Sequence, residues 1–206
     1  MKRMKRTNIV LIVLLVGAVS YLFYIHTKNV NRQIEAAYDV PDKHTQTSPN
    51  ADLVVLDFNN YGCAHCQTLH PVLKEAIRRD GKIRYISRSV SWTGDEWSKT
   101  LVASAYAAGE QGKFIEMHDA IYENWPIDNR DELFTAASKA GIDTKQLSRD
   151  LSRSDIMAWV DENKEFFDSW GIRRTPTLII GKAKFYRPDS EKPTVDEILE
   201  QFEKAR

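Results

Sequence analysis

Two cysteines, Cys63 and Cys66, are separated by two residues, and they are the only cysteines in the chain. So few cysteines exclude a disulfide-rich scaffold and a four-cysteine metal site within one chain. Residues three positions apart on a first helical turn lie about 5–6 Å from each other, which is within the reach of a disulfide. Because closing so small a ring adds only about 2 kcal/mol of stability, the spacing favours reversible redox chemistry over structural support.

Other uses of the cysteine pair fit the sequence less well. Metal binding by Cys63, His65 and Cys66 would lack a fourth ligand nearby. Covalent haem attachment needs a histidine directly after the second cysteine, and Gln67 occupies that position. An inert structural disulfide is the remaining alternative. We therefore expect a redox pair with no metal and no dissociable cofactor.

The expected place of the pair at the start of a helix gives the two cysteines different roles. Unpaired backbone N–H groups and the positive end of the helix dipole favour a thiolate at Cys63. His65 adds to this effect when it is protonated or donates a hydrogen bond. Cys66 lies one turn further along, so we expect it to be more buried and to act as the resolving thiol.

The elements that must position this pair are those of an α/β domain. Short apolar runs predict strands, and apolar residues at helical spacing predict helices. In chain order these are a strand at 53–58, a helix at 63–79, a strand at 83–90, a helical region over about 92–168, a strand at 177–180, a hairpin strand at 184–186 and a closing helix that begins at Pro193.

The cysteine segment resembles the active-site region of thioredoxin-fold oxidoreductases, and most closely that of the DsbA-like thiol:disulfide oxidoreductases. Asp57 lies six residues before Cys63, where that family carries a buried acid that takes the proton of the resolving cysteine. Pro71 lies five residues after Cys66, where the active-site helix is kinked in thioredoxin folds. Thr175-Pro176, just before a predicted strand, resembles the cis-proline loop that faces the cysteines and pairs with the substrate backbone.

This resemblance implies a thioredoxin-like fold with an inserted α-helical subdomain, covering residues 51–206. It also implies an enzyme, an extracytoplasmic protein disulfide oxidoreductase that forms or exchanges disulfide bonds in exported proteins. Strongly oxidising relatives have Pro-His between the cysteines, whereas this chain has Ala64-His65, so the direction of electron flow stays open among oxidase, isomerase and reductase. The alternative is a reductase or a metallochaperone-type assembly factor, for copper or cytochrome maturation, in which the cysteines would be soft metal ligands.

The N-terminal segment has the composition of a transmembrane signal-anchor. Residues 1–8 carry four Lys and Arg residues, and residues 9–25 are uncharged and mostly apolar. As a helix, the apolar run would extend roughly 25 Å, the short end of what spans a bilayer. The charge pattern would keep residues 1–8 in the cytoplasm and send the rest of the chain across. A signal peptide cleaved near Ser20 is the alternative, and residues 26–50 are polar enough to predict a tether.

The charge distribution limits the partners that the chain can attract. The whole chain has 29 basic and 29 acidic residues, and residues 51–206 carry 22 basic and 26 acidic ones, so we expect no nucleic-acid partner. The resemblance implies exported protein substrates and a membrane redox partner, either a DsbB-like oxidant or a reductase. We expect a monomer in the bacterial inner membrane, with a single pass and the catalytic domain on the periplasmic side.

Overall fold

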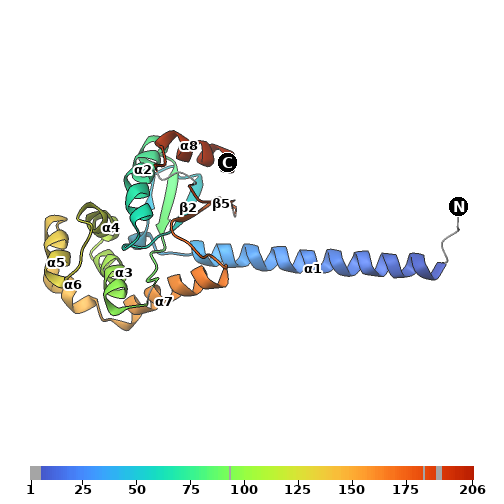
Figure 1. The fold of residues 1–206 in the computed structure, drawn as a ribbon, viewed down its shortest axis with the longest axis horizontal. Coiled ribbons are helices and arrows are strands. Elements are labelled where there is room, and N and C mark those ends of the chain that lie inside the picture. Colours follow the sequence, from blue (N-terminus) through green and yellow to red (C-terminus); the bar gives the residue numbers. More distant parts are fainter. Residues whose placement is uncertain (1–5, 93, 183, 189–191) are drawn as a thin grey trace. The chain divides into compact units, whose positions relative to one another are not determined.

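The structure is a computed structural model that describes the chain except residues 1–5, 93, 183 and 189–191 (Figure 1). Within helices and strands, the side chains of residues 6–13, 30, 31 and 184 also lie outside the described part. The chain divides into two compact units, residues 1–39 and residues 40–206.

The first unit is one long helix, α1 (Arg6–Tyr38). The predicted span at residues 9–25 falls on this helix. The side chains of residues 9–13, the first five of that span, lie outside the described part. The predicted cytoplasmic segment, residues 1–8, lies mostly outside the described residues. Over the described residues, no helix is both long enough and apolar enough to cross a membrane.

The second unit is built on a five-stranded mixed sheet with the strand order β1-β3-β2-β4-β5. Its central strand β2 pairs in parallel with β3 and antiparallel with β4, and the two edge strands are antiparallel to their neighbours. The strands are β1 (Gln46–Thr47), β2 (Leu53–Phe58), β3 (Ile83–Ser87), β4 (Thr177–Ile180) and β5 (Lys184–Tyr186). The parallel pair needs a crossover connection, which is α2 (Ala64–Asp80).

Two helices pack together on the sheet beside β2, namely α2 and α8 (Val195–Ala205) (Figure 1). They share an apolar core with the sheet, in which Leu73 and Ile77 of α2 and Phe202 of α8 are buried among strand residues. A capping box formed by Thr194 and Glu197 fixes the start of α8, because each residue satisfies a backbone N–H of the other.

Five helices lie in the sequence between β3 and β4 and form a second apolar core. They are α3 (Glu96–Gly109), α4 (Phe114–Glu123), α5 (Arg130–Lys139), α6 (Thr144–Asp150) and α7 (Ser154–Ser169). In Figure 1 they occupy the part of the unit away from α8. The β2–α2–β3 and β4–β5–α8 halves, with helices inserted between them, give the thioredoxin-like α/β fold that the sequence predicts.

Residues 40–50 differ from the prediction of a polar tether over residues 26–50. Asp42–His44 form a short 3-10 helix, η1, and Gln46–Thr47 form β1, which pairs with β3. The His44 ring is buried and lies against the rings of Tyr106, Phe114 and Trp159, with centroid distances of 5.0 to 5.7 Å. This segment therefore belongs to the folded unit, and α1 continues through residues 26–38.

Candidate active site

The two cysteines lie at the start of α2, as free thiols with different exposure. Cys63 is the N-cap residue of the helix and is partly buried, whereas Cys66, in the first turn, is 2% exposed. An N-cap residue faces the N–H groups that have no partner within the helix. The fold thus gives Cys63 the accessible position and Cys66 the protected one, as the sequence predicts.

Thr175 and Pro176 come from a distant part of the chain to face the cysteines. The Thr175–Pro176 peptide bond is cis. When Cys63 is protonated, its thiol donates to the carbonyl oxygen of Thr175 at 3.5 Å. This contact is made because β4, which begins at Thr177, pairs antiparallel with β2, so that the loop before β4 lies beside the loop after β2.

The surroundings of Cys63 lower its pKa from 9.0 to about 5. The largest cause is a hydrogen bond from the Cys66 thiol to the Cys63 sulfur. Burial opposes the shift, and hydrogen bonds from the Thr175 side chain and from the backbone N–H groups of Cys66 and His65 support it. Cys63 is therefore a thiolate at neutral pH, which is the form that attacks disulfides.

Cys66 has the opposite character. Burial raises the pKa of its thiol far above the usual range, and its hydrogen bond to Cys63 and the negative charges of Asp57 and Cys63 raise it further. The two cysteines thus differ in chemical state, since Cys63 is a thiolate at neutral pH and Cys66 keeps its proton.

Asp57, the predicted proton acceptor, is a buried carboxyl whose charge acts on the Cys66 thiol. It is 5% exposed on β2, and burial raises its pKa from 3.8 to about 7. Its Oδ2 accepts hydrogen bonds from Tyr85 at 3.1 Å and from Asn59 at 3.0 Å. Its Oδ1 is buried and receives no hydrogen bond from any described residue, so this oxygen can take or give a proton.

Asp57 is surrounded by a buried polar network, which local sequence patterns do not reveal. Tyr85, on β3, also contacts Nε2 of His118 at 3.2 Å, and Nδ1 of the same ring lies 2.9 Å from the Tyr61 hydroxyl. Burial lowers the pKa of His118 to about 3, so its ring is neutral. The strand register explains why Tyr85 reaches Asp57. Tyr85 pairs with Val55, which lies two residues before Asp57 and on the same face of the sheet.

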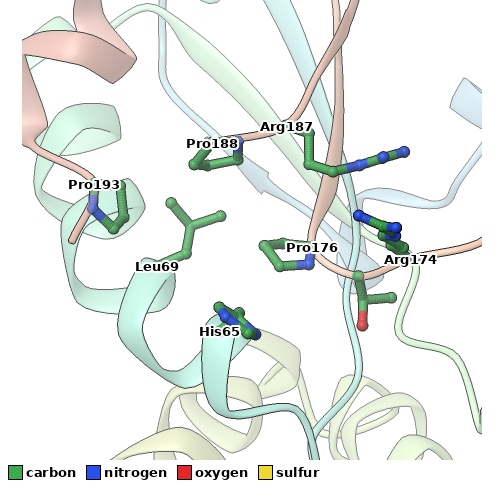
Figure 2. Close-up of a pocket in the computed structure, with 8 residues that line it drawn as sticks. His65, Leu69, Arg174, Pro176, Arg187, Pro188 and Pro193 are labelled. Atoms are coloured by element: carbon green, nitrogen blue, oxygen red, sulfur yellow. The ribbon is translucent and has the colours of Figure 1, made fainter. Parts of the chain in front are cut away.

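His65 lines a cavity at the surface of the unit. The cavity has a volume of about 160 Å³ and opens beside the cis-proline loop (Figure 2). It is lined by His65, Leu69, Arg174, Thr175, Pro176, Arg187, Pro188 and Pro193. The predicted substrate-binding residues Thr175 and Pro176 thus share one surface with His65, next to Cys63.

A second cavity is bounded by Asn60, Tyr61 and Gly62, the three residues that precede Cys63. It has a volume of about 370 Å³, and three tryptophans, Trp92, Trp97 and Trp125, line it. Among the described residues, no three His, Cys, Asp or Glu side chains are grouped as metal ligands.

The fold and the site together define a thioredoxin-fold domain with an asymmetric cysteine pair at the start of its first sheet-packed helix. The family described as Thioredoxin matches residues 39–203 of the chain. The chain therefore belongs to the thioredoxin family, and the match begins twelve residues before the predicted domain boundary at residue 51.

Curated relatives are longer than this chain. The Na(+)/H(+) antiporter NhaA 3 of Salinispora tropica is 21% identical over 168 residues, which make up 81% of this chain and 26% of that protein. The Na(+)/H(+) antiporter NhaA 1 of Salinispora arenicola is 24% identical over 148 residues, 71% of this chain and 23% of that protein. The chain thus spans about a quarter of the length of these relatives.

Several solved structures share the fold. The catalytic domain of Proteus mirabilis ScsC superimposes with a TM-score of 0.72 at 16% identity, covering 86% of this chain and 97% of that one. The thiol-disulfide exchange protein alpha-DsbA2 from Wolbachia pipientis has a TM-score of 0.71 at 19% identity, with coverages of 87% and 97%. BdbD from Bacillus subtilis, in its oxidised form, has a TM-score of 0.66 at 19% identity, with coverages of 79% and 91%.

Proposed function

We propose that this chain is a thiol:disulfide oxidoreductase that acts on the cysteines of other proteins. The observation that carries the proposal is the opposite shift of two neighbouring thiols, down for Cys63 and up for Cys66, with a buried carboxyl beside them. A structural disulfide needs no such asymmetry, whereas exchange through a mixed disulfide does. The solved thiol-disulfide exchange protein of the same fold supports the proposal.

In the oxidising direction, a substrate thiolate attacks Sγ of Cys63 in the Cys63–Cys66 disulfide. That disulfide breaks, and Cys66 leaves with the electron pair and takes a proton from Asp57. A second substrate thiolate then attacks the substrate sulfur of the mixed disulfide and releases Cys63 as a thiolate. The substrate loses two electrons and the cysteine pair gains them, and the reverse sequence reduces a substrate disulfide.

The low pKa of Cys63 favours one direction of electron flow, from the substrate to the cysteine pair. Each unit by which the Cys63 pKa falls stabilises the reduced pair by about 1.4 kcal/mol, or roughly 30 mV toward oxidising power. We therefore propose net oxidation or isomerisation, with a disulfide-bearing, quinone-linked membrane protein as the oxidant that restores the pair. Equilibration with a glutathione buffer tests this, because a potential of about −120 to −180 mV supports it and one near −270 mV makes the chain a reductase.

The exchange mechanism itself is tested by trapping. A Cys66→Ala variant keeps the attacking thiol but lacks the resolving one, so mixed disulfides through Cys63 should accumulate on gels run without reductant. The matched control is Cys63→Ala, which should trap none. Equal patterns for the two variants would refute exchange through Cys63.

We also propose that residues 9–25 anchor the chain in the bacterial inner membrane, with the cysteines on the periplasmic side. The support is the uncharged apolar run that follows four basic residues. The full chain should stay in the membrane pellet after alkaline extraction, and its cysteines should react with a membrane-impermeant thiol reagent in whole spheroplasts. Release of the chain into the soluble fraction would contradict the proposal.

A further inference from the structure

The cavity beside the cis-proline loop combines an apolar part with a basic part. Its apolar lining residues are Leu69, Pro176, Pro188 and Pro193, and its lining also includes the two arginines Arg174 and Arg187. In Figure 2 both guanidinium groups lie on one side of Pro176, whereas Leu69 and Pro193 lie on the other side. The cavity therefore presents two different surfaces to whatever enters it.

Both arginines are available to a ligand. Arg174 and Arg187 are exposed, and neither forms an ion pair with a carboxylate of the described residues. The Nε of Arg187 donates to Oγ1 of Thr177 at 3.3 Å, which orients the side chain and leaves its terminal nitrogens free of described partners. Arg174 directly precedes Thr175, whose carbonyl oxygen accepts from Cys63. Both positive charges thus lie within reach of a segment bound at the reacting sulfur.

The apolar part has room for one side chain. The whole cavity has a volume of about 160 Å³, which is close to the ~150 Å³ of a cavity that holds benzene. An aliphatic side chain that fills it would gain about 25 cal/mol for each Å² of apolar surface removed from water.

We propose that this cavity selects substrate segments that carry an apolar and an acidic side chain within a few residues of the reacting cysteine. The inference rests on the proposed exchange function and names the substrate class of the same site. Charge complementarity supports it, because two arginines border the cavity although residues 51–206 carry more acidic than basic residues overall. The negative net charge of residues 51–206 would repel acidic segments elsewhere on the unit. The two arginines attract such segments locally, at the cavity.

The test compares short peptides that contain one cysteine, one leucine and either Glu or Lys at the same neighbouring position. The oxidised protein should form the mixed disulfide with the Glu peptide about tenfold faster than with the Lys peptide, as expected for steering by two exposed charges. Raising the ionic strength from about 0.01 M to about 1 M should remove most of this ratio, because the Debye length falls from about 30 Å to 3 Å.

Variants identify the groups responsible. The double variant R174Q/R187Q should bring the ratio close to one, and R174K/R187K should retain most of it because the charges remain. R173Q removes an exposed arginine that does not line the cavity, and it should leave the ratio unchanged. A ratio near one in the unaltered protein, or an equal loss in R173Q, would overturn the inference.

Two further measurements separate this inference from the exchange function. Reduction of the protein by the uncharged reagent dithiothreitol reports cysteine reactivity without peptide recognition. Peptides with serine in place of cysteine report binding alone, and the Glu peptide should bind more tightly than the Lys peptide. Failure of exchange with every thiol refutes the proposed function, whereas equal binding of the two serine peptides refutes the substrate class.

Discussion

The hydroxyl of Tyr85 helps to decide how readily Asp57 ionises. It donates to Oδ2 of the carboxylate, and this bond lowers the Asp57 pKa against the larger effect of burial. A hydrogen bond to a charged group contributes about 1.5–3 kcal/mol, so Tyr85→Phe should raise the Asp57 pKa by about one to two units above its value near 7.

The pH dependence of resolution by Cys66 measures this shift. The step needs the Asp57 carboxylate as base, so its rate should rise with pH and level off above about 7. In Tyr85→Phe the levelling should move to higher pH. Tyr122→Phe is the matched control, because the Tyr122 hydroxyl donates to Asn59 and not to Asp57. Equal shifts in both variants would show a general effect of the network instead.

Cys66 itself is the main reason for the low pKa of Cys63. Its thiol supplies the largest of the hydrogen bonds to the Cys63 sulfur. Cys66→Ala should therefore raise the Cys63 pKa by about one to two units, and Thr175→Ala should raise it less. Thiolate absorbance or alkylation rate as a function of pH gives both values. An unchanged pKa in Cys66→Ala would mean that the backbone N–H groups alone stabilise the thiolate.

At the scale of elements, the sequence predicts the helices and strands that local patterns of apolar and turn residues define. The strand at 53–58 and the hairpin strand at 184–186 have the predicted bounds, because apolar runs and turns are local signals. Cys63, Cys66 and Asp57 come together because they flank one strand-to-helix turn. Tyr85 and Arg187 could not be found in this way, because Tyr85 reaches its place through the pairing of β2 with β3, and Arg187 directly follows β5, which pairs with β4.

The segment before β2 shows the same limit. Residues 40–50 are polar in sequence, and His44 becomes buried only because three aromatic rings of the helical insertion surround it. No periodicity in the segment itself could reveal that contact. The 3-10 helix η1 is therefore an element of the folded unit that composition alone assigns to a tether.

The packing of η1 against α3 gives a test of that assignment. A Cβ atom added at Gly109 would lie 2.8 Å from Nε2 of His44 and 3.0 Å from the carbonyl oxygen of Lys43. Gly109→Ala should therefore destabilise the fold by about 1–3 kcal/mol through overpacking, although alanine is the better helix former. Urea unfolding measures the difference.

A double-mutant cycle supplies the control for Gly109→Ala. In a His44→Ala background the ring that meets the new methyl group is absent, so the added cost should be much smaller. The same cost with and without His44 would show that η1 does not pack against α3.

At the scale of the whole molecule, the redox state of two atoms should change the stability of the entire domain. At Cys63, the unfolded chain binds more protons than the folded reduced protein between pH 5 and 9, because folding lowers the pKa of this thiol from 9.0 to about 5. The contribution of Cys63 to the free energy of unfolding of the reduced protein therefore rises with pH across this window, by up to about 1.4 kcal/mol for each pH unit. Cys63 is only partly buried, so solvent screening reduces this gain.

The oxidised protein has no Cys63 thiolate and therefore lacks this pH-dependent contribution. It has instead a disulfide that closes a small loop, which adds about 2 kcal/mol to the free energy of unfolding at any pH. Asp57 titrates in both forms, with a raised pKa that makes each form lose stability as pH rises from about 4 to about 7. Burial, the largest cause of the raised pKa, acts in both forms, so most of this loss cancels in the difference between them. The reduced form should thus be the less stable one near pH 5 and should overtake the oxidised form as the pH approaches 9.

Denaturant unfolding of both forms at pH 5, 7 and 9 measures this difference directly. A Cys63→Ser/Cys66→Ser variant has neither thiolate nor disulfide, so its stability should lack the rise with pH that belongs to Cys63. If the difference between reduced and oxidised protein stayed constant with pH, the folded state would give the thiolate no advantage over the unfolded chain. The pair would then have no thermodynamic reason to act as an oxidant, because the stability gained on reduction is the driving force that draws electrons from a substrate.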